Sequence, residues 1–216
     1  MAQKVTVNMS AQVAMREIDG NTMADLGGRY PQMVLVSADV DTSSRVQGFV
    51  ERFPERHYNI GIAEQNMMSF AAGLAQEGAI PFCFTFAPFA SMRACEQVRT
   101  DICYPNLPVR IVANYSGYSG GKSGCTHCAL EDVAIMSSFG NMCVIEPADP
   151  YLCAKVMETT MDWEGPVYIR LAREAAPQLY PQELPYQIGR ALILREGEDG
   201  AFICAGITVH FALEAA

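Results

Sequence analysis

The sequence predicts an α/β protein with a doubly wound, mostly parallel sheet that carries helices on both faces. The first observation is a series of short, continuous apolar runs, which are typical of parallel strands buried on both sides. The second is that segments with helical spacing of apolar residues separate these runs, as in successive β-α-β units. With 216 residues, half of them apolar and 18% charged, the chain can form one full core and part of a second unit.

The first half of the chain is expected to alternate between helix and strand, with glycines at helix ends. In order, the expected elements are a helix over Val13–Gly28 that the Gly27-Gly28 pair ends, a strand over Met33–Asp39, a polar loop over Val40–Phe49, a short strand at Tyr58–Ile60, a helix from about Ala63 to Gln76 stopped by Gly78, and a strand over Ile80–Phe84.

The same alternation continues to Arg173. In order, we expect a helix over Ala90–Cys103, a strand over Val109–Asn114, a Gly- and Ser-rich loop over Ser116–Gly124, a helix over Glu131–Ser138, a strand over Met142–Glu146, a helix through Met161 that Asp149 caps, and a strand over Val167–Leu171.

The end of the chain has a different pattern. Gln178–Gln187 contains prolines and no periodicity, which is typical of a linker. Ala191–Leu194 and Ala201–Ala205 are expected strands of a new unit, and a helix follows them. So short a segment cannot form a core of its own, so it is either part of a larger unit or docks on another subunit. We therefore expect a domain over residues 1–177, a linker over 178–190 and the start of an incomplete domain over 191–216.

Charge and hydropathy disfavour several classes of protein. The net charge of -9 argues against nucleic acid as a partner, because phosphates require a basic stripe. No apolar run approaches the roughly 18–20 residues that cross a bilayer, and Met1–Met9 shows no export signal. The eight cysteines lie mostly in apolar segments, so we expect reduced thiols in a cytoplasmic protein without a membrane partner.

Glu64 is the first candidate functional residue, because it stands at the expected start of a helix after a strand and a glycine turn. A carboxylate at this position commonly does no more than complement the helix dipole. The alternative is an acid at the carboxyl ends of the strands, where α/β sheets bind their ligands.

Two other motifs suggest chemistry only weakly. Gly121-Lys122-Ser123 matches the end of a phosphate-binding loop, but the first glycine of that motif would fall on Ser116 and no helix follows directly, which disfavours a nucleotide triphosphatase. Cys125 and Cys128 have C-x-x-C spacing, yet a second pair of zinc ligands is missing, and so is the early helix of a thioredoxin-like site. Two small residues in a ligand-facing loop is the favoured interpretation.

Phe86 and Phe89 fall just past a strand, where aromatic rings either pack in the core or form a platform for a planar heterocycle. Together with two other motifs they resemble the pyrimidine-binding domain of transketolases, above all the separate C-terminal subunit of split transketolases. The motifs are Gly61-Ile62-Ala63-Glu64-Gln65, Phe86-x-x-Phe89 and Gly124-Cys125-Thr126-His127. The resemblance covers about residues 10–175, and Gly206-Ile207-Thr208-Val209 resembles the opening of that family's C-terminal domain.

The resemblance implies the thiamine diphosphate-binding fold and a role for each matching position. The acid at position 64 hydrogen-bonds a ring nitrogen of the aminopyrimidine and activates the cofactor; burial opposes its charge, whereas the helix N-terminus favours it. By role, the positions are Glu64 and His127 for catalysis; Glu64, Phe86, Phe89 and Asp39 for the cofactor; and Arg16, Ser43, Tyr115, Ser123, His127 and Arg173 for the substrate.

The sequence departs from the family pattern around the substrate. Ser123 replaces an acid that contacts a sugar hydroxyl, Tyr115 stands where a phosphate-contacting histidine is common, and Cys128 replaces a glutamine. These differences imply an unusual ketose or aldose, and Lys122 adds a positive charge that an acidic substrate can use.

The resemblance also implies a partner. The family holds the diphosphate and its divalent metal with a Gly-Asp-Gly motif and a downstream Asn, which this sequence lacks. A separate diphosphate-binding subunit that holds Mg²⁺ or Ca²⁺ is therefore expected, in an α₂β₂ assembly that transfers a two-carbon ketol unit between sugar phosphates. The alternatives are a deoxyxylulose-phosphate synthase-like subunit, a 2-oxo acid dehydrogenase β-like subunit, or a non-catalytic scaffold.

Overall fold

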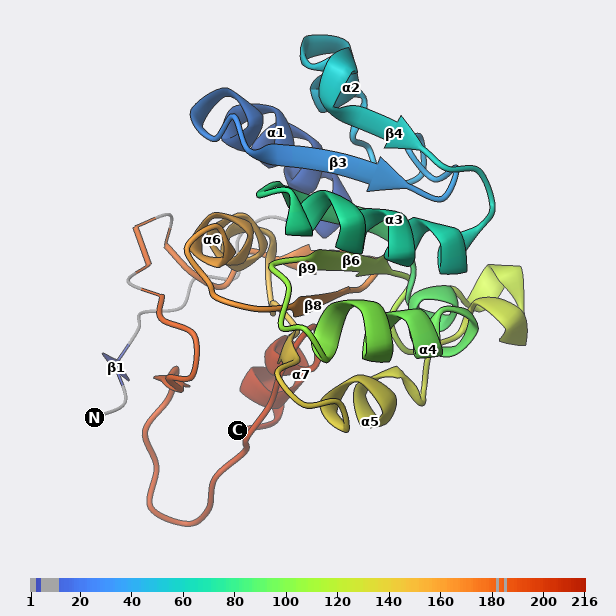
Figure 1. Cartoon of the computed structure of the whole chain (residues 1–216). Helices are drawn as coiled ribbons and strands as arrows, with labels where there is room; N and C mark the ends of the chain where they lie inside the picture. The colour runs from blue at the N-terminus through green and yellow to red at the C-terminus, as the bar shows by residue number, and fades with distance from the viewer. Residues whose placement is uncertain (1–2, 5–11, 182, 185) are drawn as a thin grey trace.

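A computed structural model describes residues 3–4, 12–181, 183–184 and 186–216 of the chain (Figure 1). Most of the segment Met1–Met9, where the sequence shows no export signal, lies outside these residues. The centre of the molecule is a six-stranded parallel sheet with the strand order β4-β3-β5-β6-β8-β7. Its strands are β3 (Met33–Ser37), β4 (His57–Asn59), β5 (Ile80–Phe86), β6 (Arg110–Asn114), β7 (Cys143–Ile145) and β8 (Val167–Leu171). The predicted doubly wound α/β class is confirmed.

Alternate residues of the central strands face opposite layers of helices. Phe82 and Phe84 of β5 join one core, and Cys83 between them joins the other. The first core includes side chains of α1 (Met15–Arg29), α2 (Gln47–Arg52) and α6 (Pro150–Thr160). The second includes α3 (Glu64–Gln76) and α5 (Asp132–Ser137). Because both faces are covered, the strands can be apolar throughout, as the sequence predicted.

The segment predicted as one helix over Ala90–Cys103 is helical but not uniform. Two π-helical segments, η2 (Phe89–Arg93) and η3 (Val98–Cys103), flank the short helix α4 (Cys95–Gln97). Nothing in the spacing of apolar residues indicated this change of pitch. The polar loop predicted over Val40–Phe49 is also shorter than expected, because α2 begins at Gln47.

The predicted first helix is present with slightly shifted bounds, and Gly27-Gly28 lies inside its last turn rather than just beyond it. α1 continues to Arg29, and Val13 belongs to the strand β2 (Gln12–Ala14) instead. Gly27 is needed for packing: a Cβ added there would lie 2.6 Å from the ring of Phe49. Arg56 satisfies the end of the helix, because its guanidinium donates to the carbonyls of Gly27 at 2.8 Å and Tyr30 at 3.1 Å.

The segment after the sheet packs against the same domain. β9 (Ala175–Pro177) pairs antiparallel with β2. The backbone N–H groups of Leu179 and Tyr180 then donate to the carboxylate of Asp149, which also caps α6 by accepting from Leu152 N at 2.7 Å. The predicted cap at Asp149 is therefore confirmed. The second carboxylate oxygen of Asp149 binds the backbone of residues 179–180, which follow the last strand of the central sheet.

The predicted strand over Ala201–Ala205 is wrong. These residues have no regular secondary structure, and Ile203 is 98% exposed. A strand requires a hydrogen-bonding neighbour, and none pairs with this segment among the described residues. The strand predicted over Ala191–Leu194 is reduced to β10 (Leu192–Ile193), which pairs with β1 (Gln3–Lys4). The final helix, α7 (Thr208–Ala215), packs on the first core through Val209 and Leu213.

Arg110 links the amino-terminal end of the central sheet to the end of α6. This fully buried side chain donates to the carbonyls of Thr160, Trp163 and Gly165, at the end of α6 and in the turn after it. Burial lowers the pKa of Arg110 to about 10, so the guanidinium stays charged at neutral pH. A surface hollow of about 370 Å³ adjoins Arg110. The guanidinium of Arg110 already donates to three carbonyls and is therefore not available to a ligand in this hollow.

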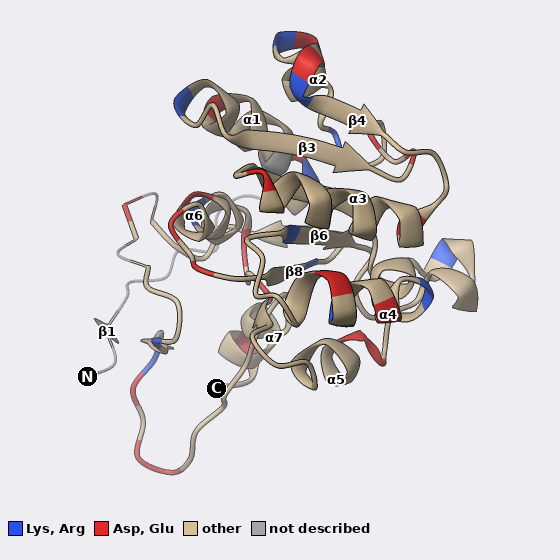
Figure 2. Ribbon diagram, viewed as in Figure 1, with Lys and Arg blue, Asp and Glu red and all other residues tan. Residues whose placement is uncertain are grey.

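Other expectations concern the whole molecule. All eight cysteines are free thiols, as expected. Within the described part of the chain, no helix combines the length and the apolarity that crossing a bilayer requires. Figure 2 shows Lys and Arg scattered over separate elements of the described chain rather than gathered into a stripe.

Candidate active site

The candidate site lies where the parallel strands end. β5 ends at Phe86, Tyr115 follows the last residue of β6, and Glu64 begins α3 directly after β4 and its turn. In the sheet order β4-β3-β5-β6, the chain passes from β3 to β4 on one side and from β5 to β6 on the other, so a topological switch point lies between the ends of β3 and β5. Such points are where open α/β sheets bind ligands.

Four rings form a cluster at this point. The ring of Phe86 lies 6.0 Å from Phe89, 4.4 Å from Tyr115 and 5.6 Å from the imidazole of His127, measured between ring centroids. Phe89 and His127 meet edge to face at 5.2 Å. The structure thus brings together four candidates that lie up to 41 positions apart in the sequence.

Gly120 makes this close approach possible. A Cβ at this position would lie 2.3 Å from the carbonyl oxygen of His127 and 2.8 Å from the ring of Tyr115. His127 ends the short turn η5 (Cys125–His127), and its Nδ1 lies 2.9 Å from the hydroxyl of Thr126. This contact engages Nδ1 and leaves Nε2 as the ring nitrogen for a ligand.

Glu64 is buried, with 2% of its surface exposed, although it carries a carboxylate. Arg93 Nη1 donates to Glu64 Oε2 at 2.7 Å, and this is the one side chain that hydrogen-bonds Glu64 among the described residues. The same guanidinium lies over Phe89, with Cζ 4.1 Å from the ring centroid. A buried carboxylate beside aromatic rings suits a planar nitrogen heterocycle, which can both stack and hydrogen-bond.

Two predicted arginines belong to segments that lie side by side, and one of them contacts the cluster. The guanidinium of Arg173 lies 5.3 Å from the ring centroid of Tyr115. Arg16 follows β2 and Arg173 precedes β9, and the pairing of Ala14 with Ala175 brings the two segments together. The Nε atoms of both arginines are buried and lack a hydrogen-bond partner among the described residues. Unsatisfied guanidinium donors at one place are suited to an anion.

The remaining candidates make contacts of their own. Asp39 is exposed, adopts φ +60°, and accepts from Asn59 Nδ2 at 3.1 Å, which links the ends of β3 and β4. Ser43 donates to the carbonyl of Val40 at 3.0 Å. Ser123 and Lys122 lie exposed on the turn η4 (Gly121–Ser123).

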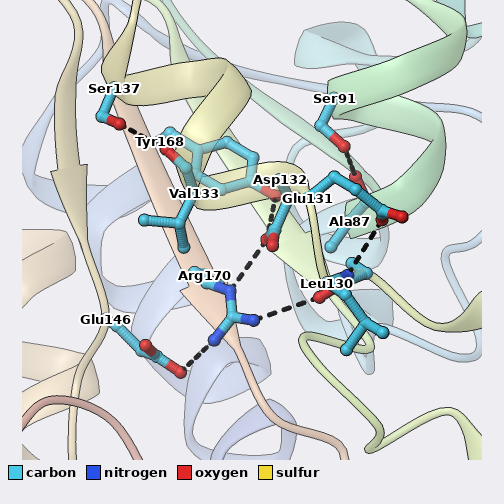
Figure 3. Close-up of polar contacts among 11 residues, drawn as sticks. Ala87, Ser91, Leu130, Glu131, Asp132, Val133, Ser137, Glu146, Tyr168 and Arg170 are labelled. Carbon is cyan, nitrogen blue, oxygen red and sulfur yellow. Dashed lines mark hydrogen bonds and ion pairs between the residues drawn. The ribbon is translucent and has the colours of Figure 1, made fainter.

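A buried ion network supports the loop that carries His127 (Figure 3). Arg170 donates to Asp132 at 2.8 Å, to Glu146 at 2.5 Å and to the carbonyl of Ala129 at 3.2 Å. Burial opposes the charge of Arg170, but the bond to Asp132 and the charge of Glu146 outweigh it and hold its pKa above the ordinary value. Burial raises the pKa of Glu146 despite that partner.

Sequence reasoning missed both this network and Arg93. Arg93 is four residues past Phe89, and nothing in the pattern indicates that it turns toward Glu64, 29 positions away. A buried amide was also missed: Asn114 Nδ2 donates to Ser44 Oγ at 3.1 Å beside the site. The described residues hold no group of three or more His, Cys, Asp or Glu side chains that could bind a metal ion.

Comparison with known proteins gives consistent matches. The family model "Transketolase, pyrimidine binding domain" matches residues 11–178. A putative transketolase C-terminal section of Methanocaldococcus jannaschii is 42% identical over 203 residues, 93% of this chain and 64% of that protein. A 6-deoxy-6-sulfo-D-fructose transketolase subunit of a Clostridium species is 38% identical over 91% of this chain and 62% of its own length.

A solved structure described as a split gene transketolase, inactive β4 tetramer, is also similar. It has a TM-score of 0.87 and 41% identity, over 95% of this chain and 67% of that chain. The present chain spans less than two thirds of the two curated relatives.

Proposed function

This chain belongs to the transketolase family, whose pyrimidine-binding domain it contains, and from that membership we propose that it is one subunit of a two-subunit transketolase. The proposed enzyme is a transferase of class EC 2.2.1 that moves a two-carbon ketol unit from a ketose to an aldose. The observation that carries the proposal is a buried carboxylate, Glu64, beside the ring cluster at the carboxyl ends of the strands.

The residues on the cofactor side fit an aminopyrimidine. Thiamine diphosphate, when bound, supplies the nucleophilic carbon that carries the ketol unit. Phe86 and Phe89 would pack against the planar ring, Glu64 would hydrogen-bond its ring nitrogen, and Asp39 would lie near the subunit boundary. Since Glu64 is 2% exposed, water does not compete for that hydrogen bond.

The residues on the substrate side form a second group. His127 would exchange a proton with the reacting oxygens through Nε2, because Nδ1 already contacts Thr126. Arg16, Arg173 and Ser43 would bind a terminal phosphate, and Tyr115 and Ser123 would contact the sugar. The Clostridium relative is named for a sulfo-sugar, and the unsatisfied guanidinium donors suit any such terminal anion.

The rest of the site is assigned to a partner. We place the diphosphate and its Mg²⁺ or Ca²⁺ on a separate N-terminal subunit, in an α₂β₂ assembly that works in carbohydrate metabolism in the cytoplasm. Residues 1–177 are the proposed pyrimidine-binding domain, 178–190 a linker, and 191–216 the start of the C-terminal domain.

The test is a ketol-transfer assay with this chain alone, with the diphosphate-binding subunit alone, and with both. Activity is expected only with both, and Glu64→Gln should lower it by roughly 10²–10⁴-fold. Glu77→Gln is the matched control, because Glu77 is an exposed acid at the other end of the same helix. Full activity of this chain alone contradicts the two-subunit assignment. An unaffected Glu64→Gln enzyme contradicts the role of Glu64, and a requirement for a 2-oxo acid donor favours the synthase-like or dehydrogenase-like alternative over the transketolase.

A further inference from the structure

Arg93 contacts both groups that the proposed function assigns to the pyrimidine ring. Its Nη1 donates to Glu64 Oε2 at 2.7 Å, and its Cζ lies 4.1 Å from the ring centroid of Phe89. Glu64 is almost fully buried, whereas 45% of the Arg93 side chain is exposed. One planar cation therefore satisfies the buried carboxylate and covers the aromatic face at the same time.

A guanidinium shares the recognition features of an aminopyrimidine. It is planar and delocalised, it presents N–H donors in its own plane, and it stacks on aromatic rings. A buried carboxylate and an aromatic face therefore cannot distinguish the two groups by hydrogen bonding and stacking alone. A pyrimidine ring that stacks on the face of Phe89 covered by Arg93 would have to displace the guanidinium.

Without Arg93, the isolated chain would hold an uncompensated buried charge. Burial of an unpaired carboxylate is costly, and a hydrogen-bonded cation offsets this cost. Arg93 lies at the end of the π-helical turn η2 with almost half of its side chain in solvent. Its long side chain can thus rotate toward water without repacking the core.

We propose that Arg93 is a placeholder for the pyrimidine ring, which pairs with Glu64 and covers Phe89 in the cofactor-free subunit and rotates outward when thiamine diphosphate binds. This proposal rests on the proposed function. Its consequence is that Arg93 stabilises the chain but competes with the cofactor. An arginine that only supports the site would stabilise the chain and strengthen cofactor binding together.

The first test measures cofactor affinity by calorimetric titration of the assembled subunits with thiamine diphosphate at fixed Mg²⁺. Loss of one charged hydrogen bond from the competing state should tighten the Kd of Arg93→Met by about tenfold. Arg93→Lys keeps the charge and should lie between the two. Arg99→Met is the matched control, an exposed arginine on the following turn, and should bind like the wild type.

The second test measures thermal unfolding of the full chain without cofactor. Arg93→Met should lower the Tm, and it should lower it much less when Glu64→Gln has already removed the buried charge. Weaker or unchanged cofactor binding by Arg93→Met overturns the placeholder role. Failure of the assembled wild type to bind thiamine diphosphate overturns the proposed function, and the placeholder role with it.

Discussion

Asp149→Ala is expected to be strongly destabilising, because one buried carboxylate serves two structural elements. Oδ1 accepts from Leu152 N at 2.7 Å and caps α6, while Oδ2 accepts from Leu179 N at 2.7 Å and Tyr180 N at 2.8 Å. Alanine leaves all three N–H groups without these acceptors. The carboxylate itself is fully buried, and both Leu179 and Tyr180 belong to the first core.

The magnitude follows from the groups that lose a partner. Loss of a helix cap costs about 1 kcal/mol, and each buried N–H left unsatisfied costs about 1–3 kcal/mol. Burial raises the pKa of Asp149 despite its backbone hydrogen bonds, so the wild type also bears a desolvation cost that alanine removes. The net loss of unfolding free energy is about 3 kcal/mol, which lowers the Tm by roughly 6–12 °C for a chain of this size.

The assay is urea unfolding of the full chain, followed by circular dichroism and by the fluorescence of Trp163. This single tryptophan lies just beyond α6 and reports on that end of the helix. Asp149→Asn keeps one oxygen acceptor and should lose less stability than alanine, and Asp162→Ala, at an exposed position nearby, should change little. A loss below about 1 kcal/mol for Asp149→Ala would mean that the cap alone matters and that residues 179–180 are not held by this carboxylate.

Two further predictions concern α1. Gly27→Ala should destabilise the chain by about 1–3 kcal/mol, because its Cβ would lie 2.6 Å from the Phe49 ring. Gly28→Ala should be neutral or stabilising in the same urea assay, because its Cβ would meet the flexible end of Arg52 at 3.3 Å and the Phe53 ring at 4.0 Å, an ordinary contact distance. Equal effects of the two substitutions would refute the packing argument. Hydrogen bonds from Arg29 and Lys155 lower the pKa of Glu158, so its contribution is present above pH 4.5 and is lost as pH falls through the lowered pKa. Unfolding as a function of pH should therefore show Glu158→Gln less stable than wild type by at most about 1 kcal/mol at neutral pH, with the gap closing in acid.

The sequence predicted those parts of the fold that depend on local patterns. Apolar runs located the strands of the central sheet other than β4, since burial on both faces leaves a continuous apolar signal. β4, with the sequence His57-Tyr58-Asn59, lies at the edge of the sheet and has no such run. Asp149 was recognised as a cap because a short polar residue before Pro150 has a specific local role. Glycines were less reliable guides. Gly78, at φ +92°, follows a helix end as expected. Gly27 instead lies within a helix, where a side chain would collide with the ring of Phe49, a residue distant in sequence.

The site could be predicted only where residue type alone carries the information. Glu64, Phe86 and Phe89 are a recognisable set, and the structure places Phe86 beside Tyr115 and His127. The Glu64–Arg93 contact depends on how two helical segments pack, which no local pattern encodes. The prediction of a strand over Ala201–Ala205 was wrong because it also depended on a distant partner: β propensity does not ensure that a neighbouring strand is there to pair with.

The position of Arg110 has an evolutionary consequence. It begins β6 and fastens the sheet to three carbonyls, while Asn114 ends the same strand, about 13 Å away at the ordinary rise per residue. Stability is thus secured at one end of the sheet, and the proposed ligand contacts lie at the other. Substitutions in the loop from Tyr115 to Cys128 leave the contacts of Arg110 intact, so selection can alter the proposed substrate specificity without first having to restore folding.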